Sequence, residues 1–95
     1  MTDDEKLVVL KGDLQLITSA QDDYLYKLLQ LGTSAIRREG IKLIKDDIEC
    51  DMAVIHYAAY LFRKRAAADT TMPRFLRYEL NNLLFSQKGA ATNDI

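Results

Sequence analysis

The sequence lacks tryptophan, and it has one cysteine, one proline and four glycines among its 95 residues. So few turn-forming residues argue against a many-stranded sandwich or barrel. The single cysteine, Cys50, excludes a disulfide within the chain and a zinc site built from several cysteines. No apolar run approaches the ~18 residues of a membrane span, and the acidic residues 1–5 do not resemble a signal peptide. We therefore expect a soluble intracellular protein with no membrane contact.

The composition is that of an ordinary globular protein, with 48% hydrophobic and 28% charged residues. The length fits one small domain, which has room for a modest core and little room for a large catalytic cleft. A net charge of −1 gives the whole molecule no attraction to DNA or to an anionic membrane.

Apolar spacing and helix start and stop signals predict an all-α fold, a small bundle of four helices. Thr2 or Asp3 is expected to cap the first helix, Ser19 the second, and Pro73 is expected to open the fourth. Gly40 suits the end of the second helix, and Gly32 is expected to bend it. The expected helices cover residues 3–14, 22–39, 46–68 and 73–87.

The third helix is expected to be the central element. It opens with acidic residues and closes with basic ones, which suits the helix dipole at both ends. Two adjacent apolar stripes give it a broad buried face. We expect one helical domain, residues 1–89, followed by a flexible C-terminal tail, residues 90–95.

The charges are segregated along the chain. Residues 1–51 carry 7 basic and 11 acidic side chains, net −4, whereas residues 52–95 carry 6 basic and 3 acidic, net +3. Such a division suits head-to-tail contact between identical subunits, and equally a partner that meets only one end.

Candidate chemical sites have simpler structural explanations. His56 has no further metal ligand at helical spacing, since Met52 and Tyr60 are poor partners. Cys50 lies between two acidic residues, which would raise the pKa of its thiol and make it unreactive. The acidic residues 46–51 suit the start of a helix. We therefore expect no catalytic residue, no metal site, no cofactor and no enzymatic activity.

A cluster of basic residues has two possible interpretations. It could bind nucleic-acid phosphate, or it could consist of favourable charges at a helix C-terminus beside a solvent-exposed face. It consists of residues 63–65 with Arg74, Arg77 and Lys88. A helix-turn-helix protein would use residues 73–87 for recognition, but Glu79 among the candidate readers would repel phosphate. The candidate readers are Arg74, Arg77, Tyr78, Asn81 and Asn82.

Tyrosine and arginine together are favoured at protein–protein contacts. The same part of the chain contains both, which predicts an interface with other subunits or with a partner. The predicted interface residues are Tyr60, Arg63, Arg65, Arg74, Arg77 and Tyr78.

The order and spacing of four segments resemble the small head–tail connector proteins of long-tailed bacteriophages and prophages, also called head-completion or neck-ring proteins. The resemblance covers roughly residues 4–87. It rests on residues 10–16 (LKGDLQL), on residues 22–36 from Asp22-Asp23 to Ala35-Ile36, on residues 51–61 (DMAVIHYAAYL), and on Met72-Pro73 with Asn82-Leu83-Leu84.

The resemblance implies a structural virion protein made in the bacterial host cytoplasm and located in the virion neck. Its subunits would form a ring, commonly twelve-fold, below the portal protein. The ring would extend the channel through which genomic DNA passes without sequence-specific binding, and would dock the next neck or tail-completion protein. This sequence is shorter than many members of that family. The alternatives are a small DNA-binding regulator that uses the basic C-terminal half, and a generic helical adaptor.

Overall fold

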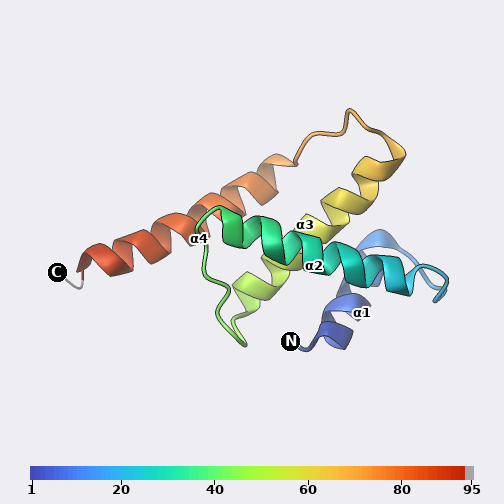
Figure 1. Cartoon of the computed structure of the whole chain (residues 1–95), viewed down its shortest axis with the longest axis horizontal. Helices are drawn as coiled ribbons and strands as arrows, with labels where there is room; N and C mark the ends of the chain where they lie inside the picture. Colours follow the sequence, from blue (N-terminus) through green and yellow to red (C-terminus); the bar gives the residue numbers. More distant parts are fainter. Residues whose placement is uncertain (94–95) are drawn as a thin grey trace.

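The computed structural model describes the backbone of residues 1–93 and the side chains of residues 1–89. Within residues 1–93 the chain forms four helices and no strand, so the predicted all-α fold is confirmed. In Figure 1, α2 crosses over α3, α1 lies beside them near the N-terminus, and α4 extends away toward the C-terminus. The helices are α1 (Asp3–Leu14), α2 (Asp22–Arg38), α3 (Ile48–Ala66) and α4 (Arg74–Asn93).

The helix starts follow the expected capping chemistry in two cases and depart from it in a third. Thr2 caps α1 in a capping box with Glu5, and the Asp47 carboxylate accepts backbone N–H groups at the start of α3. The predicted cap of α2 is wrong. Gln21 occupies the N-cap position without a side-chain hydrogen bond, and Ser19 uses its backbone carbonyl to accept the Asp22 N–H.

The predicted bounds of α3 were two residues too wide at each end. Asp46 has a φ of 62°, in the left-handed region, which ends any helical continuation toward the N-terminus. At the other end, Ala67 is extended, with φ −143° and ψ 100°. The helix therefore spans Ile48–Ala66, although its acidic start and basic end are as predicted.

The predicted end of the last helix at Gln87 is wrong, because α4 continues through Gly89 to Asn93. One glycine near a helix end costs only about 1 kcal/mol relative to alanine, and two alanines follow it. The predicted flexible tail, residues 90–95, therefore overlaps the helix as far as Asn93, and residues 94–95 lie outside the described residues. Pro73 lies just before the helix, one position earlier than expected, and its carbonyl accepts the N–H groups of Leu76 and Arg77.

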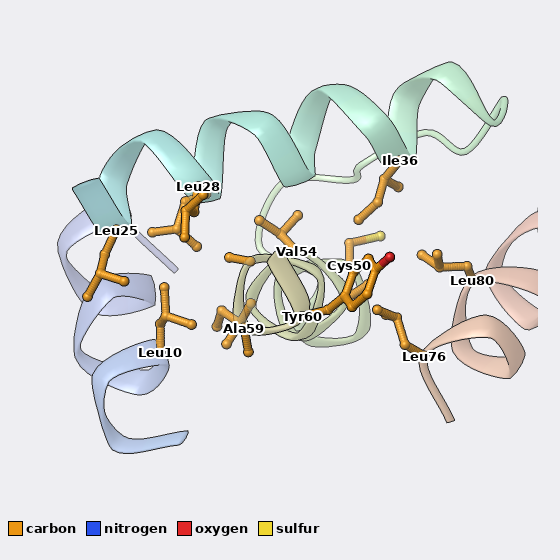
Figure 2. Close-up of a cluster of buried hydrophobic side chains, with 14 of the residues drawn as sticks. Leu10, Leu25, Leu28, Ile36, Cys50, Val54, Ala59, Tyr60, Leu76 and Leu80 are labelled. Atoms are coloured by element: carbon orange, nitrogen blue, oxygen red, sulfur yellow. The ribbon is translucent and has the colours of Figure 1, made fainter. Parts of the chain in front are cut away.

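The hydrophobic core surrounds α3, as predicted for a central helix. Figure 2 looks along α3 and shows Leu10 and Leu25 on the side of α1 and the start of α2. On the other side, Ile36 from α2 approaches Leu76 and Leu80 from α4. All five side chains are fully buried. The core thus joins α1 and α4 to opposite sides of the same helix.

Gly32 marks the close approach of α2 to α3. A Cβ atom built there would lie 3.3 Å from the Tyr57 Cβ and 3.4 Å from the Val54 carbonyl oxygen. The buried glycine therefore lets the two backbones pack closely where the helices cross. The sequence had suggested a bend at this position, but the structure supplies a packing reason for the glycine.

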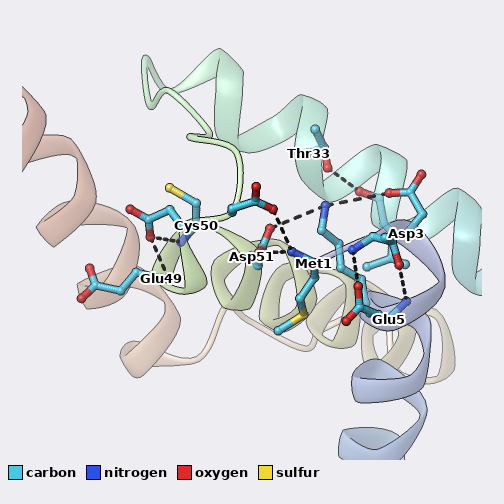
Figure 3. A network of polar contacts seen from close by, with 12 residues as sticks. Met1, Asp3, Glu5, Thr33, Glu49, Cys50 and Asp51 are labelled. Atoms are coloured by element: carbon cyan, nitrogen blue, oxygen red, sulfur yellow. Dashed lines mark hydrogen bonds and ion pairs between the residues drawn. The ribbon is translucent and has the colours of Figure 1, made fainter.

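A buried carboxylate, Asp51, joins α3 to the start of the chain. Its Oδ2 accepts a hydrogen bond from the Met1 amino group at 2.9 Å, and its Oδ1 lies 3.8 Å from the Lys6 Nζ. Figure 3 shows this network, with Met1 and Asp51 at its centre. Because a buried carboxylate is stable only when its charge is compensated, these contacts explain how Asp51 is accommodated in the first turn of α3.

A tyrosine–carboxylate contact between α1 and α2 yields a pH prediction. The Tyr26 hydroxyl donates a hydrogen bond to Asp4, and this bond raises the pKa of Tyr26 from 10.0 to about 12. Since the folded pKa exceeds the unfolded one, the stabilisation is complete below pH 10 and is lost as the pH rises toward 12. Absorbance titration at 295 nm is expected to show a component near pH 12 that Asp4→Asn moves toward 10.

Tyr26→Phe serves as the control for that titration. It should remove the high-pH component and leave the other four tyrosines unchanged. An Asp4→Asn curve that coincides with the wild-type curve, or a component near pH 12 that persists in Tyr26→Phe, would contradict the assigned contact.

Candidate protein-binding groove

An exposed apolar stripe runs along α4 on the side opposite its core contacts. Phe75, Tyr78 and Phe85 are exposed by 54%, 63% and 65%. They follow one another at i, i+3 and i+10, which places them on one face of a helix, whereas Leu76 and Leu80 point into the core. Because α4 is apolar on two faces, it carries more hydrophobic surface than it buries in the core of the chain.

Two residues of this stripe, Phe75 and Tyr78, border a groove of about 720 Å³ between α3 and α4. The walls are largely apolar, and the ionisable groups among the lining residues are acidic or imidazole, with no lysine or arginine. The groove is lined by Ile48, Glu49, Met52, His56, Phe75, Tyr78, Glu79, Asn82, Leu83 and Ser86. An open apolar groove with exposed aromatic rims is the kind of surface that binds another protein.

His56 and Glu79 join the two walls of the groove. The His56 Nδ1 lies 2.8 Å from the Glu79 Oε2, and the imidazole packs edge-to-face against Phe75 with ring centroids 5.2 Å apart. Both side chains are about four-fifths buried. His56 therefore has the structural role that the sequence favoured, because it holds α4 against α3.

The six predicted interface residues do not gather on one surface. Arg63 pairs with Asp13 near the end of α1, and Arg65 donates to Gln21 before α2. Arg77 pairs with Glu39 just after the other end of α2, and this hydrogen bond raises the pKa of the guanidinium. Because 18 residues separate Gln21 from Glu39, the two arginine contacts are about 27 Å apart along α2.

Tyr60, one of the six predicted interface residues, is buried within the single chain. Its side chain is only 9% exposed and belongs to the core, where Tyr57 packs edge-to-face against it at 5.9 Å. Tyr60 projects from the side of α3 that faces α4 and therefore does not point to solvent (Figure 2). Of the six, Arg63, Arg65, Arg74 and Tyr78 are exposed.

The basic end of α3 is stabilised by contacts within the chain. The Arg65 guanidinium lies 4.3 Å from the Phe62 ring centroid and 5.2 Å from that of Tyr24. The Lys64 Nζ lies 5.7 Å from the Tyr60 ring centroid. These cation–π contacts and the Arg63–Asp13 pair orient the cations while leaving them accessible from one side.

Cys50 and the acidic residues near it have structural explanations. The Cys50 thiol is 2% exposed and lies 3.7 Å from the Lys42 carbonyl oxygen. Burial raises the pKa of this thiol, with a further contribution from nearby Asp47. Nucleophilic chemistry needs an accessible thiolate, so this cysteine is unsuited to it. Asp47 meanwhile caps α3.

A polar pocket between α1 and α2 is a weaker candidate site. It measures about 340 Å³ and includes Asp3, Lys6 and Arg37 among its lining residues. Lys6 is already engaged by Asp3 at 3.9 Å and by Asp51 at 3.8 Å. Because acids of the same chain already engage Lys6, this side chain is not free to hold a ligand in the pocket.

The apolar stripe on α4 is the feature that the sequence interpretation missed. The inward leucines of residues 73–87 were recognised, but Phe75, Tyr78 and Phe85 share a second face at helical spacing. The helical spacing of these three aromatic residues is the sequence signal that indicates this second face. The position of Ile48 and Met52 across the groove depends on the packing of α3 against α4, which no local pattern specifies.

Within residues 1–93, no cluster of three or more histidine, cysteine or acidic side chains could hold a metal ion. In the same part of the chain, none of the helices has the length and apolar character required to cross a bilayer. No protein-family model, curated protein or solved structure matches the sequence. What the protein does must therefore be inferred from its own residues.

Proposed function

We propose that this chain is a structural subunit of a phage head–tail connector. In this role it assembles with copies of itself into a ring below the portal protein, in the neck of the virion, and it acts by binding and not by catalysis. The ring would extend the DNA channel and dock a neck or tail-completion protein. The observation that supports this proposal best is the open apolar groove between α3 and α4.

The groove supports assembly because it provides surface that the chain itself does not cover. Phe75 and Tyr78 remain more than half exposed at its rim, beside Ile48 at 59%. Exposed aromatic and aliphatic side chains of this density are typical of protein interfaces. Apolar side chains that are exposed singly are common on monomeric proteins, whereas a contiguous exposed patch marks an interaction site.

The basic end of the molecule supports a second contact, which we assign to the portal. Arg63 and Arg65 lie at the end of α3, and Arg74 lies at the start of α4 after a short loop. All three are exposed, and Arg74 forms no ion pair within the described part of the chain. A partner with an acidic surface would meet several cations there at once.

The double variant Arg63→Glu/Arg74→Glu tests this assignment. It should weaken binding to the portal protein encoded by the same genome by at least about tenfold, since several charges change from attraction to repulsion at once. Binding is measured by co-sedimentation of the connector with assembled portal rings. Lys45→Glu, which reverses an exposed cation in the segment between α2 and α3, is the matched control and should leave portal binding unchanged.

The alternative of a DNA-binding regulator is tested with the same proteins. A regulator would bind duplex DNA with an affinity that falls steeply as salt increases, and Arg63→Glu/Arg74→Glu would abolish that binding. The exposed face of α4 carries Phe75 and Phe85 beside Tyr78, which suits a protein partner better than phosphate. A DNA complex together with no portal complex would overturn the connector proposal.

A further inference from the structure

An exposed ridge on α2 carries the positive charge that the lining of the groove lacks. It is formed by Lys27, Leu31, Ser34 and Arg38, which recur at i, i+4, i+7 and i+11 and therefore share one side of the helix. Leu31 is 57% exposed at its centre. Neither Lys27 nor Arg38 forms an ion pair within the described residues. The α2 ridge thus presents one leucine between two cations.

The groove complements this ridge in charge and in polarity. Its lining includes the exposed Glu49, and Glu79, which is about four-fifths buried and paired with His56, but no lysine or arginine. Its apolar walls, which include Ile48 and Tyr78, can accept an aliphatic side chain such as leucine. A leucine flanked by cations would therefore bury its apolar group while a flanking cation meets the exposed Glu49 carboxylate at the rim.

A shallow depression beside the ridge adds a second point of contact. It measures about 250 Å³ between α2 and α3, and Tyr57 and Leu61 form part of it together with Leu31. The rim of the groove carries the exposed ring of Tyr78. When Leu31 of one copy enters the groove of another, an aromatic side chain from the groove rim can occupy this depression.

One chain cannot bring these two surfaces together. The side of α2 that includes Gly32 packs against α3, so the ridge faces away from the body. The groove lies between α3 and α4. A contact between such different surfaces is head-to-tail, and its repetition generates a ring when the rotation closes.

We infer that the α2 ridge of one copy docks in the α3–α4 groove of the next copy. This inference rests on the proposed connector function and names the surfaces through which neighbouring subunits meet. Leu31 is the apolar anchor, and Lys27 and Arg38 pair with the acidic rim of the groove. A second copy is the occupant because this chain supplies both complementary surfaces and leaves both of them exposed.

The test uses two variants that each disable one surface, Leu31→Asp on the ridge and Tyr78→Asp at the groove. Both positions are exposed, so the fold should tolerate them. Each variant alone should associate at least about tenfold more weakly than the wild type and have the mass of one chain. An equimolar mixture should form a one-to-one dimer that grows no further, because only one ridge and one groove remain intact.

Masses are measured by light scattering over a concentration series up to about 1 mM, which reaches weak contacts. Ile17→Asp is the matched control, because Ile17 is 96% exposed and lies outside both surfaces. It should assemble like the wild type. Circular dichroism must show the same helix content for every variant, so that loss of assembly reports on the contact and not on folding.

A charge exchange tests the same contact independently. Arg38→Glu should weaken assembly at least about threefold, and mixing it with Glu49→Lys should restore hetero-association between the two variants. These substitutions change exposed side chains and leave the apolar anchor in place. No recovery in the mixture would place Arg38 and Glu49 outside a shared contact.

The inference fails if wild-type protein remains monomeric at 1 mM, if both single-surface variants assemble normally, or if their mixture remains monomeric. Portal binding is scored separately with Arg63→Glu/Arg74→Glu. A chain that binds the portal without the ridge–groove contact overturns this inference alone. A chain that makes the contact but ignores the portal overturns the proposed function and leaves the contact standing.

Discussion

Leu80→Ala is expected to lower the free energy of unfolding by about 2–5 kcal/mol. Leu80 is fully buried, and it lies with Leu76 against Ile36 on the side of α3 that faces α4 (Figure 2). Truncation removes apolar contacts and leaves a cavity between the helices. The cavity persists because the closely packed helices cannot move together to fill it. A domain of this size has a total stability of about 5–14 kcal/mol, so the loss would be a large fraction.

Urea denaturation followed by circular dichroism at 222 nm measures this effect. Phe85→Ala on the same helix is the matched control, because Phe85 is 65% exposed and its truncation should change stability by no more than about 0.5 kcal/mol. Both proteins are compared at low micromolar concentration, where assembly contributes little. Equal losses from the two variants would contradict the packing of α4 described above.

Gly32→Leu is expected to destabilise the protein by about 1–3 kcal/mol or more. Even a Cβ atom at this position approaches the Val54 carbonyl oxygen to 3.4 Å. The further atoms of leucine would meet the backbone of α3, which cannot move without separating the helices. The same unfolding measurement applies, and a parallel loss of near-ultraviolet circular dichroism should report on disturbed packing around Tyr57.

Gly12→Ala provides the opposite case in the same protein. No atom lies within 4 Å of a Cβ at position 12, and this residue is within α1. The substitution should stabilise the protein by up to about 1 kcal/mol, because alanine favours the helix more than glycine does. If Gly32→Leu were as harmless as Gly12→Ala, α2 and α3 would not cross as closely as the structure shows.

Much of the fold could be predicted because its signals are local. The acidic first turns, the Thr2 cap and the leucine spacing of α1 are all encoded within a few residues of where they act. The order of acidic and basic residues in α3 is equally local. Helix ends were less predictable, since Gly89 continues a helix while Asp46 adopts a left-handed conformation that stops one.

The candidate site was less accessible to prediction because it depends on packing between distant segments. Tyr60 and Tyr78 both lie among tyrosine and arginine residues in the sequence, yet the first is buried and the second exposed. The pairing of His56 with Glu79 joins residues 23 positions apart. Only the arrangement of α4 against α3 decides which aromatic side chains form a groove and which fill the core.

The charge segregation along the sequence is partly cancelled when the chain folds. The basic half was expected to form one interface, whereas Arg65 and Arg77 contact residues beyond opposite ends of α2. Several of these cations also have acidic partners from the first half of the chain, including Asp13 and Glu39. Folding therefore neutralises part of a contrast that looks strong along the sequence.

The most direct measurement is the mass of the wild-type protein by light scattering over a concentration series, repeated with portal rings present. A connector subunit should form discrete ring-sized assemblies, alone or on the portal, with a stoichiometry set by the ring. A chain that remains monomeric, ignores the portal and binds duplex DNA would contradict a role in virion assembly and would indicate a regulator.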